Sequence, residues 1–176
     1  MVELEVKLVI CGKEERDEYR SCGISHLITI GNPEAENVPP EWFAGSHLPL
    51  WFGDVVSKAD AEYYWTKRPQ PEDLRQAILF FRKAWQSNGS SILISCDYGA
   101  SRSPALAYVS LADRFGAGRE PEALDKILTL RPKSIPNNLV VWIGDKLLKR
   151  NGTLTNPVNK LYADVSSQFM EIVKGE

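Results

Sequence analysis

The feature that most constrains the fold is a predicted strand, a short loop and a helix in immediate succession at residues 91–109. The apolar run 92–94 is continuous, which is typical of a central strand covered on both faces. The loop that follows contains Gly99, and Pro104 suits the first turn of the helix after it. Strands that alternate with helices imply parallel pairing. The segment therefore favours an α/β fold, with this loop at the carboxyl edge of the sheet, where such folds bind ligands.

The pattern of apolar residues extends this arrangement along the chain. It predicts further strands near residues 3–10, 26–30 and 47–52, and helices near residues 13–20, 71–87, 103–115, 121–130, 137–149 and 157–174. Residues 53–70 are expected to be irregular. The expected fold class is α/β, with a central, mostly parallel sheet of about four to five strands and helices on both faces, in three layers.

One domain is expected to span residues 1–176, because a chain of this length can bury a single hydrophobic core. The last predicted helix carries an apolar stripe, which we expect to pack on the domain, with a contact surface for a partner as the alternative. The stripe consists of Val158, Leu161, Tyr162, Val165, Phe169 and Ile172.

Composition argues against several functional classes. The net charge of −2 provides no basic field for nucleic acid or an anionic membrane. No apolar run approaches the ~20 residues of a membrane span, and the first residues lack the basic start of a signal peptide. The three cysteines show no Cys-x-x-Cys spacing, so we expect no metal and no other cofactor. The expected protein is cytoplasmic and monomeric.

The loop between strand and helix has the properties of a phosphate site. A short loop in this position can turn its backbone N–H groups inward and form a nest for an anion. The helix adds its unbonded N–H groups and the positive end of its dipole. Arg102 stands where its planar fork can hold two phosphate oxygens. The expected phosphate-binding residues are Asp97, Tyr98, Gly99, Ala100, Ser101 and Arg102.

Cys96 lies at the start of this loop and is the candidate nucleophile. The positive surroundings favour its thiolate near neutral pH, and a thiolate beside a bound phosphate ester is positioned to attack phosphorus. Ser103 is expected to donate a hydrogen bond to the sulfur and to assist its later departure. Asp97 would repel a phosphate, so we expect its side chain to point away. Tyr98 fits either the pocket mouth or the core.

The run Cys96-Asp-Tyr-Gly-Ala-Ser-Arg-Ser103 resembles the signature loop of cysteine-dependent protein tyrosine and dual-specificity phosphatases. The run Ser101–Val109 looks particularly like the dual-specificity branch and the compact bacterial phosphatases related to it. The resemblance covers roughly residues 25–148 in element order. It implies a phosphocysteine intermediate, no metal, and an aspartic acid on a separate loop as general acid and base. The family usually has histidine where this chain has Ser95, so lower activity at neutral pH stays open.

The general acid must reach the pocket from another loop. Asp54, in Trp51-Phe-Gly-Asp54, follows the third predicted strand, where the family places its acid. Asp60 is the alternative, because its distance from Cys96 along the sequence is closer to the usual separation in the family. A turn cap is the other role open to Asp54.

Three other segments carry weaker signals. Cys11 and Arg16 bracket a run that superficially resembles another phosphatase loop, but the spacing is one residue short and two glutamates occupy the run, so Cys11 is interpreted as a structural thiol. The aromatic run 63–65 fits either a lid at the site or the packing of a long loop. Asn137 fits either a buttress of the phosphate loop, as a similar asparagine does in the family, or a helix cap.

These observations favour hydrolysis of a phosphate monoester, with a phosphorylated protein or a small phosphomonoester as substrate. Resemblance favours phosphotyrosine or mixed protein substrates. A phosphate-binding module with little turnover is the alternative, motivated by Ser95 and by the two candidate acids. A sulfurtransferase is a third class, because a cysteine loop with an arginine can also bind sulfane sulfur.

Overall fold

The computed structural model describes the backbone of residues 7–174 and the side chains of residues 7–167, so the start of the first predicted strand lies outside the described residues. The elements are β1 (Lys7–Gly12), the 3-10 helix η1 (Lys13–Tyr19), β2 (His26–Gly31), β3 (Ser46–Trp51), α1 (Lys58–Tyr63), α2 (Pro71–Gln86), β4 (Ser91–Cys96), α3 (Arg102–Phe115), α4 (Glu120–Leu130), α5 (Asn138–Leu147) and α6 (Thr155–Lys174).

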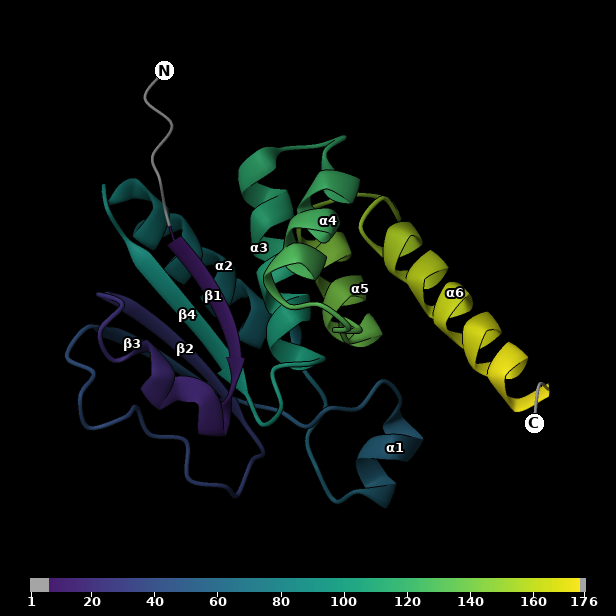
Figure 1. The fold of residues 1–176 in the computed structure, drawn as a ribbon, viewed down its shortest axis with the longest axis horizontal. Helices are drawn as coiled ribbons and strands as arrows, with labels where there is room; N and C mark the ends of the chain where they lie inside the picture. Colours follow the sequence, from purple (N-terminus) through teal and green to yellow (C-terminus); the bar gives the residue numbers. More distant parts are fainter. Residues whose placement is uncertain (1–6, 175–176) are drawn as a thin grey trace.

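The four strands form one parallel sheet in the order β1-β4-β2-β3 (Figure 1). Strand β4 lies between β1 and β2, and each of its residues is buried. The register places Gly12 beside Cys96 and Thr29 beside Ser95. The predicted α/β class with a central parallel sheet is confirmed, and the apolar run 92–94 is its central strand.

The two faces of the sheet are covered differently. One face packs on α2, α3, α4 and α5 through the main hydrophobic core, which includes Ile28, Ile94 and Leu106. The other face packs through a small cluster around Val9 and Leu93 on residues of η1 and the loops beside it. Figure 1 shows η1 on the side of the sheet opposite to the helices of the main core. The layer that covers this other face of the sheet therefore consists of one short 3-10 helix, η1, and loops.

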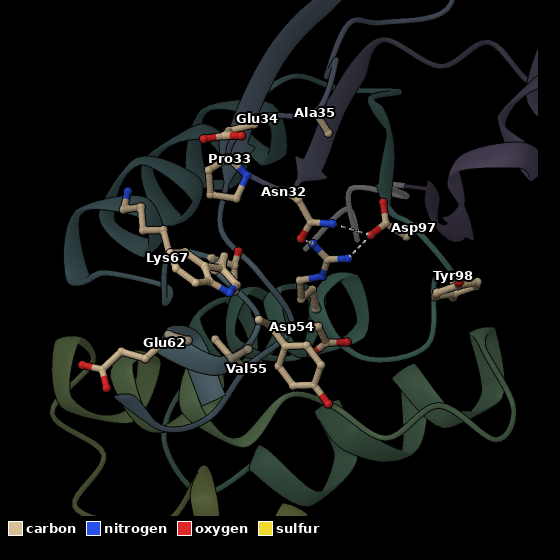
Figure 2. A pocket seen from close by; sticks show the side chains of 15 residues that line it. Asn32, Pro33, Glu34, Ala35, Asp54, Val55, Glu62, Lys67, Asp97 and Tyr98 are labelled. Atoms are coloured by element: carbon tan, nitrogen blue, oxygen red, sulfur yellow. Dashed lines mark hydrogen bonds and ion pairs between the residues drawn. The ribbon is translucent and has the colours of Figure 1, made fainter. Parts of the chain in front are cut away.

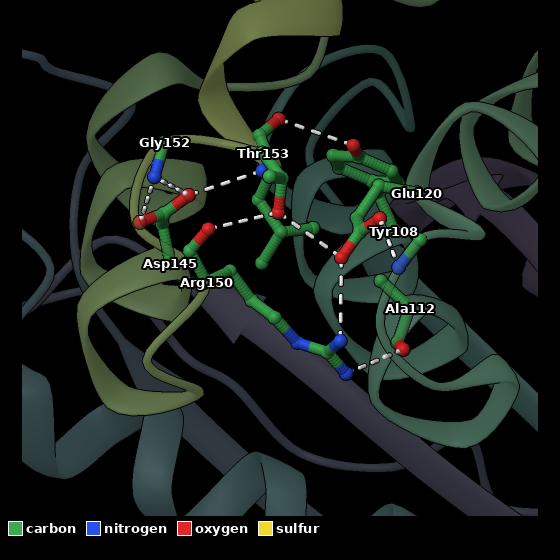
Figure 3. Close-up of polar contacts among 9 residues, drawn as sticks. Tyr108, Ala112, Glu120, Asp145, Arg150, Gly152 and Thr153 are labelled. Atoms are coloured by element: carbon green, nitrogen blue, oxygen red, sulfur yellow. Dashed lines mark hydrogen bonds and ion pairs between the residues drawn. The ribbon is translucent and has the colours of Figure 1, made fainter.

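A buried polar network joins the helices on the main-core side (Figure 3). Arg150 donates to a carboxylate oxygen of Glu120 at 3.3 Å and to the backbone carbonyl of Ala112 at 3.1 Å. Asp145 accepts from the N–H of Gly152 and Leu154, whose carbonyl accepts from the hydroxyl of Tyr108. Burial raises the pKa of Tyr108, which keeps this hydroxyl a donor. The network ties α3, α4 and α5 to the start of α6.

The segment 53–70 contains a short helix, α1, where the sequence predicted irregular structure, so that prediction is wrong for residues 58–63. The hydroxyl of Ser57 accepts from the N–H of Asp60 at 3.0 Å, and the Asp60 carboxylate accepts from the N–H of Ser57 at 3.0 Å. This reciprocal capping box satisfies two N–H groups at the helix start. The Ser-x-x-Asp spacing was the sequence signal for this helix.

Helix α6 projects away from the body of the protein (Figure 1), and its described packing lies in its first turns. Val158 is buried and Tyr162 is half-buried, with its hydroxyl donating to the carbonyl of Pro136 at 3.2 Å. Val165 is exposed, so the predicted stripe leaves the domain at this point. The side chains of the remaining two stripe residues lie outside the described residues. Among the described residues, no helix is long and apolar enough to span a bilayer.

Candidate active site

Cys96 ends the central strand, and its sulfur lies at the base of the loop that leads into α3. The sulfur is 3.2 Å from the hydroxyl oxygen of Ser103, and both residues are buried. Strand β4 and helix α3 are both packed in the core, so the separation of these two groups is set by regular elements. This contact is the one that the predicted role of Ser103 requires.

Gly99 allows the loop to pack tightly against the end of β1. Its φ of +66° lies in the left-handed region, and a side-chain β-carbon there would lie 2.4 Å from the carbonyl carbon of Cys11. A residue with a side chain would meet both conformational strain and a backbone clash. The close approach of loop and strand therefore requires glycine.

The loop directs its carbonyl groups outward. Each carbonyl from Asp97 to Ser101 accepts a hydrogen bond from outside the loop. The donors are the N–H of Lys13 to Asp97, the Arg131 guanidinium to Tyr98 and Gly99, the N–H of Ile135 to Ala100 and the N–H of Asn137 to Ser101. No backbone N–H from Asp97 to Ser101 donates to another described residue. This arrangement leaves the N–H groups available for an anion, as a phosphate nest requires.

Arg102 lies beside this nest and is only 3% exposed. One terminal nitrogen donates to the Phe52 carbonyl at 2.9 Å and lies 3.4 Å from the amide oxygen of Asn32. Its Nε, which is buried, has no hydrogen-bond partner among the described residues. A buried donor without a partner is costly, and a bound anion would satisfy it.

The expectation that Asp97 points away from the site is wrong. Its carboxylate lines the pocket and accepts from Arg102 Nη2 at 2.5 Å and from Asn32 at 3.3 Å (Figure 2). The sequence argument considered repulsion by a phosphate and left out attraction by the arginine. Because Arg102 is almost fully buried, its charge attracts the nearest carboxylate strongly. Asp97 therefore occupies one edge of the guanidinium that the prediction reserved for phosphate.

Asp54 lies at the end of β3 and reaches the loop from the other side of the pocket. Its carboxylate accepts from the hydroxyl of Ser101 at 2.7 Å and from the side-chain amide of Asn137 at 2.8 Å. The amide oxygen of Asn137 accepts from the N–H groups of Leu139 and Val140 at the start of α5. Asn137 thus both caps a helix and supports the site, so the two interpretations of this residue hold together.

Asp60 is engaged elsewhere. Its carboxylate belongs to the capping box of α1, and the hydrogen bond from Ser57 lowers the pKa of Asp60. A general acid has to carry a proton at the working pH, which a lowered pKa opposes. Asp54 lines the pocket and Asp60 does not. The geometry favours Asp54 of the two candidates.

The pocket above the loop is wide, with a volume of about 1200 Å³. Tyr98 is exposed at its edge, so the core alternative for this residue is wrong. Tyr64 and Trp65 also line the pocket, and Trp65 is 95% exposed. The interpretation of the run 63–65 as loop packing is therefore wrong, and the aromatic side chains border the candidate site.

Comparisons with known proteins agree with this geometry. No protein-family model and no curated protein matches the sequence. Human DUSP28 matches with a TM-score of 0.62 at 15% identity, over 85% of this chain and 96% of its own. DUSP15 matches with a TM-score of 0.63 at 18% identity, over 91% and 95%. Tk-PTP in its active form matches with a TM-score of 0.60 at 16% identity, over 85% and 95%.

This chain has the dual-specificity phosphatase fold. The resemblance inferred from the run 96–103 is thereby confirmed at the level of the fold, and it extends over most of the chain. At these identities the likeness defines the arrangement of elements, and the chemistry is argued from the residues themselves.

Within this phosphatase fold, the residue before Cys96 has an unexpected partner. The Ser95 hydroxyl accepts from Arg16 Nε at 2.7 Å, and both side chains are buried. Burial lowers the pKa of Arg16, while the nearby Cys11, Asp97 and Cys96 raise it. Arg16 therefore lies beneath the loop, where it places a cation near the candidate nucleophile Cys96.

Two supporting residues of the site carry no signal in the sequence. Arg16 belongs to the run 11–16, which the sequence analysis rejected as a phosphatase loop, and Arg131 follows the last residue of α4. Arg131 holds two loop carbonyls and pairs with Glu15 at 2.8 Å. Burial raises the pKa of Cys11 to about 12, consistent with a structural thiol. Among the side chains of residues 7–167, no group of three or more histidine, cysteine, aspartate or glutamate residues could hold a metal ion.

Proposed function

We propose that the protein hydrolyses phosphate monoesters through a phosphocysteine intermediate. The observation that carries this proposal is that, within the part of the chain that the structure describes, neither Arg102 Nε nor the N–H groups of the loop have a partner, and the sulfur of Cys96 lies at the base of this loop. An anion bound there satisfies donors that otherwise lack partners. Every group that the reaction needs is then supplied by the chain itself.

In the first step the thiolate of Cys96 attacks phosphorus and forms a sulfur–phosphorus bond. The bond between phosphorus and the leaving oxygen breaks, and the leaving oxygen takes a proton from Asp54. Arg102 and the loop N–H groups hold the other phosphate oxygens as charge develops on them. Ser101 supports Asp54 through its 2.7 Å hydrogen bond, which holds the acid over the loop.

In the second step water attacks the phosphocysteine. The Asp54 carboxylate accepts a proton from this water, the sulfur–phosphorus bond breaks, and the electron pair returns to Cys96. The hydroxyl of Ser103, 3.2 Å from the sulfur, donates a hydrogen bond to the departing thiolate. Inorganic phosphate leaves, and the enzyme returns to its starting state.

A phosphate-binding module with little turnover is the second candidate. The ion pair between Asp97 and Arg102 favours it, because phosphate must displace this carboxylate before it can bind both edges of the guanidinium. Serine at position 95 favours it as well, because the family usually has histidine there. The cytoplasmic location and the monomeric state remain predictions from the sequence.

Hydrolysis of para-nitrophenyl phosphate across pH tests the proposal. We expect turnover by the unmodified protein, none by Cys96→Ser, and a loss of about 10²–10³-fold in Arg102→Ala. Rapid quenching followed by mass spectrometry should detect a phosphorylated peptide that contains Cys96. Turnover that persists in Cys96→Ser would refute the covalent mechanism, and phosphate binding without turnover at any pH would favour the binding module.

A further inference from the structure

The charges that line the pocket are unusual for a site that binds a phosphate dianion. Four carboxyl groups line it, whereas only two cationic side chains do so (Figure 2). The carboxyl groups belong to Glu34, Asp54, Glu62 and Asp97, and the cations to Lys67 and Arg102. Asp54 is the proton donor of the proposed first step, so the negative charge that a substrate meets comes from Glu34, Glu62 and Asp97. A polyanionic substrate would meet repulsion at this rim.

Both cations already have anionic partners. Lys67 pairs with Asp73 at 3.5 Å, and Arg102 pairs with Asp97 at 2.5 Å. Glu34 forms no ion pair with any described residue. Within residues 7–167, Glu62 pairs only with exposed Lys58 at 3.5 Å, a contact of little strength in water. The rim therefore has an excess of negative charge.

The base of the same pocket attracts an anion. The buried Nε of Arg102 has no partner among the described residues, and the loop N–H groups beside it are unbonded. The pocket thus combines donors for a phosphate with an excess of carboxylates. A ligand that satisfies both carries a phosphate and, close to it, positive charge.

We propose that the site selects phosphopeptides in which lysine or arginine flanks the phosphorylated residue. The inference rests on the proposed function and names the substrate class of the same pocket. On binding, the ion pair between Asp97 and Arg102 is replaced by two others. The phosphate pairs with Arg102, and a cation of the substrate pairs with Asp97. The carboxylate that competes with phosphate in the empty pocket thereby becomes a contact for the substrate.

The size and the aromatic border of the pocket favour a peptide. The volume of about 1200 Å³ exceeds the ~300–1000 Å³ of usual small-ligand sites. Tyr64, Trp65 and Tyr98 border the pocket and are exposed. Exposed aromatic rings bind lysine and arginine side chains through cation–π contacts. A phosphopeptide with flanking cations uses these rings together with the acidic rim.

The test compares three phosphopeptides that share one phosphorylated residue and differ only at the two positions on either side of it. These positions carry lysine, glutamine or glutamate. We expect kcat/KM for the lysine peptide to exceed that for the glutamine peptide by roughly 5–20-fold, and the advantage to shrink with added salt. The glutamate peptide and a soluble phosphoinositide headgroup should be the poorest substrates.

Two rim variants identify the source of the preference. Asp97→Asn should bring the lysine-to-glutamine ratio towards one and lower KM for para-nitrophenyl phosphate, because the carboxylate no longer competes for Arg102. Glu34→Gln should reduce the same ratio by about 2–3-fold. Glu122→Gln, which removes an exposed carboxylate on α4 outside the pocket, is the matched control and should leave the ratio unchanged.

A binding measurement separates failure of this inference from failure of the proposed function. Fluorescence anisotropy with labelled phosphopeptides and the Cys96→Ser protein reports the same preference without turnover. Hydrolysis of para-nitrophenyl phosphate with equal kcat/KM for the lysine and glutamine peptides would overturn the inference alone. Preferred hydrolysis of the phosphoinositide headgroup would overturn it in favour of an anionic ligand. Selective binding of the lysine peptide without hydrolysis supports it and contradicts the proposed function.

Discussion

The loop 96–103 and the segment 54–67 face each other across the pocket and are stabilised in opposite ways. Each carbonyl from Asp97 to Ser101 is bound by η1 or by the segment 131–137 between α4 and α5, and Cys96, Arg102 and Ser103 are buried. The segment 54–67 instead contains a short helix capped by its own residues and exposes its aromatic side chains. The loop is therefore braced by the whole fold, and the facing segment mainly by local contacts.

This difference separates two requirements of the site. Phosphate binding needs fixed donors, and the sheet and helices supply them. In the proposed function, selection of a substrate depends on the rim, and Asp54 and Val55 link segment 54–67 to the loop and to Asn137 beside it. Variants in the loop 96–103 should therefore have a different kind of effect on activity, as well as a different size of effect, from variants in segment 54–67.

The largest expected effect tests the link between the two regions. Asp54→Asn should reduce kcat for a phosphopeptide by about 10²–10³-fold, because the leaving oxygen loses its proton donor. The limb of the pH profile that reports a protonated acid should disappear. Asp60→Asn, on the same segment, should leave kcat unchanged within about twofold, because Asp60 caps α1. A reversed pattern would assign the acid to Asp60.

A comparison of two left-handed residues tests the rigidity of each region. Gly99→Ala should lower the free energy of unfolding by roughly 2–4 kcal/mol, because a β-carbon meets Cys11 and the left-handed conformation becomes costly. Trp65 has a φ of 50° and is exposed, so Trp65→Asn should change the free energy of unfolding by less than about 0.5 kcal/mol. Urea unfolding measures both. Equal effects would show that the two regions are equally constrained.

The contact beneath the loop should be strongly coupled. Arg16→Met leaves the buried hydroxyl of Ser95 without a partner and should cost about 1–3 kcal/mol of unfolding free energy. Ser95→Ala leaves the Arg16 Nε without its acceptor and should cost a similar amount. The double variant should lose less than the sum, because neither group is then left unsatisfied. Additive losses in thermal or urea unfolding would contradict the interaction.

The smallest expected effect depends on pH. The hydrogen bond from Arg131 lowers the pKa of Glu15 from its ordinary value of 4.5. The folded state therefore gains stability above pH 4.5, and this gain is lost as the pH falls through the lower folded-state value. Since the Glu15 side chain is 37% exposed, we expect less than about 1 kcal/mol. Glu15→Gln should flatten the fall in melting temperature below pH 5, and exposed Glu14→Gln should not.

Much of the fold could be predicted because its signals are local. The apolar run 92–94 indicated the central strand, and the segments around β2 and β3 and the helices from α2 to α5 were predicted close to their observed bounds. The short α1 was missed although its capping box is visible in the sequence. The side chain of Val165 was expected to pack and is exposed, because periodicity identifies an apolar face without identifying what covers it.

The candidate site likewise has a part that the sequence predicted and a part that it did not. The sulfur, the arginine and the glycine of the loop belong to one continuous segment, so their spacing predicted a phosphate site directly. Arg16 and Arg131 reach the loop from positions distant in the sequence, and no periodic pattern indicates such contacts. The ion pair of Asp97 with Arg102 was mispredicted because it depends on the burial of the arginine, which the spacing of the two residues does not reveal.

The strand, loop and helix that place Cys96 and Arg102 together follow from the order of the residues alone. These residues are neighbours along the chain, and glycine, proline and apolar residues set their local conformation. Which groups surround Cys96 and Arg102 depends on the packing of distant segments. Strand order brought Arg16 beneath the loop, and the folding of segment 54–67 brought Asp54 and Glu62 to the pocket that the loop borders. Charges act through space, so their balance at the site exists only once distant segments have packed.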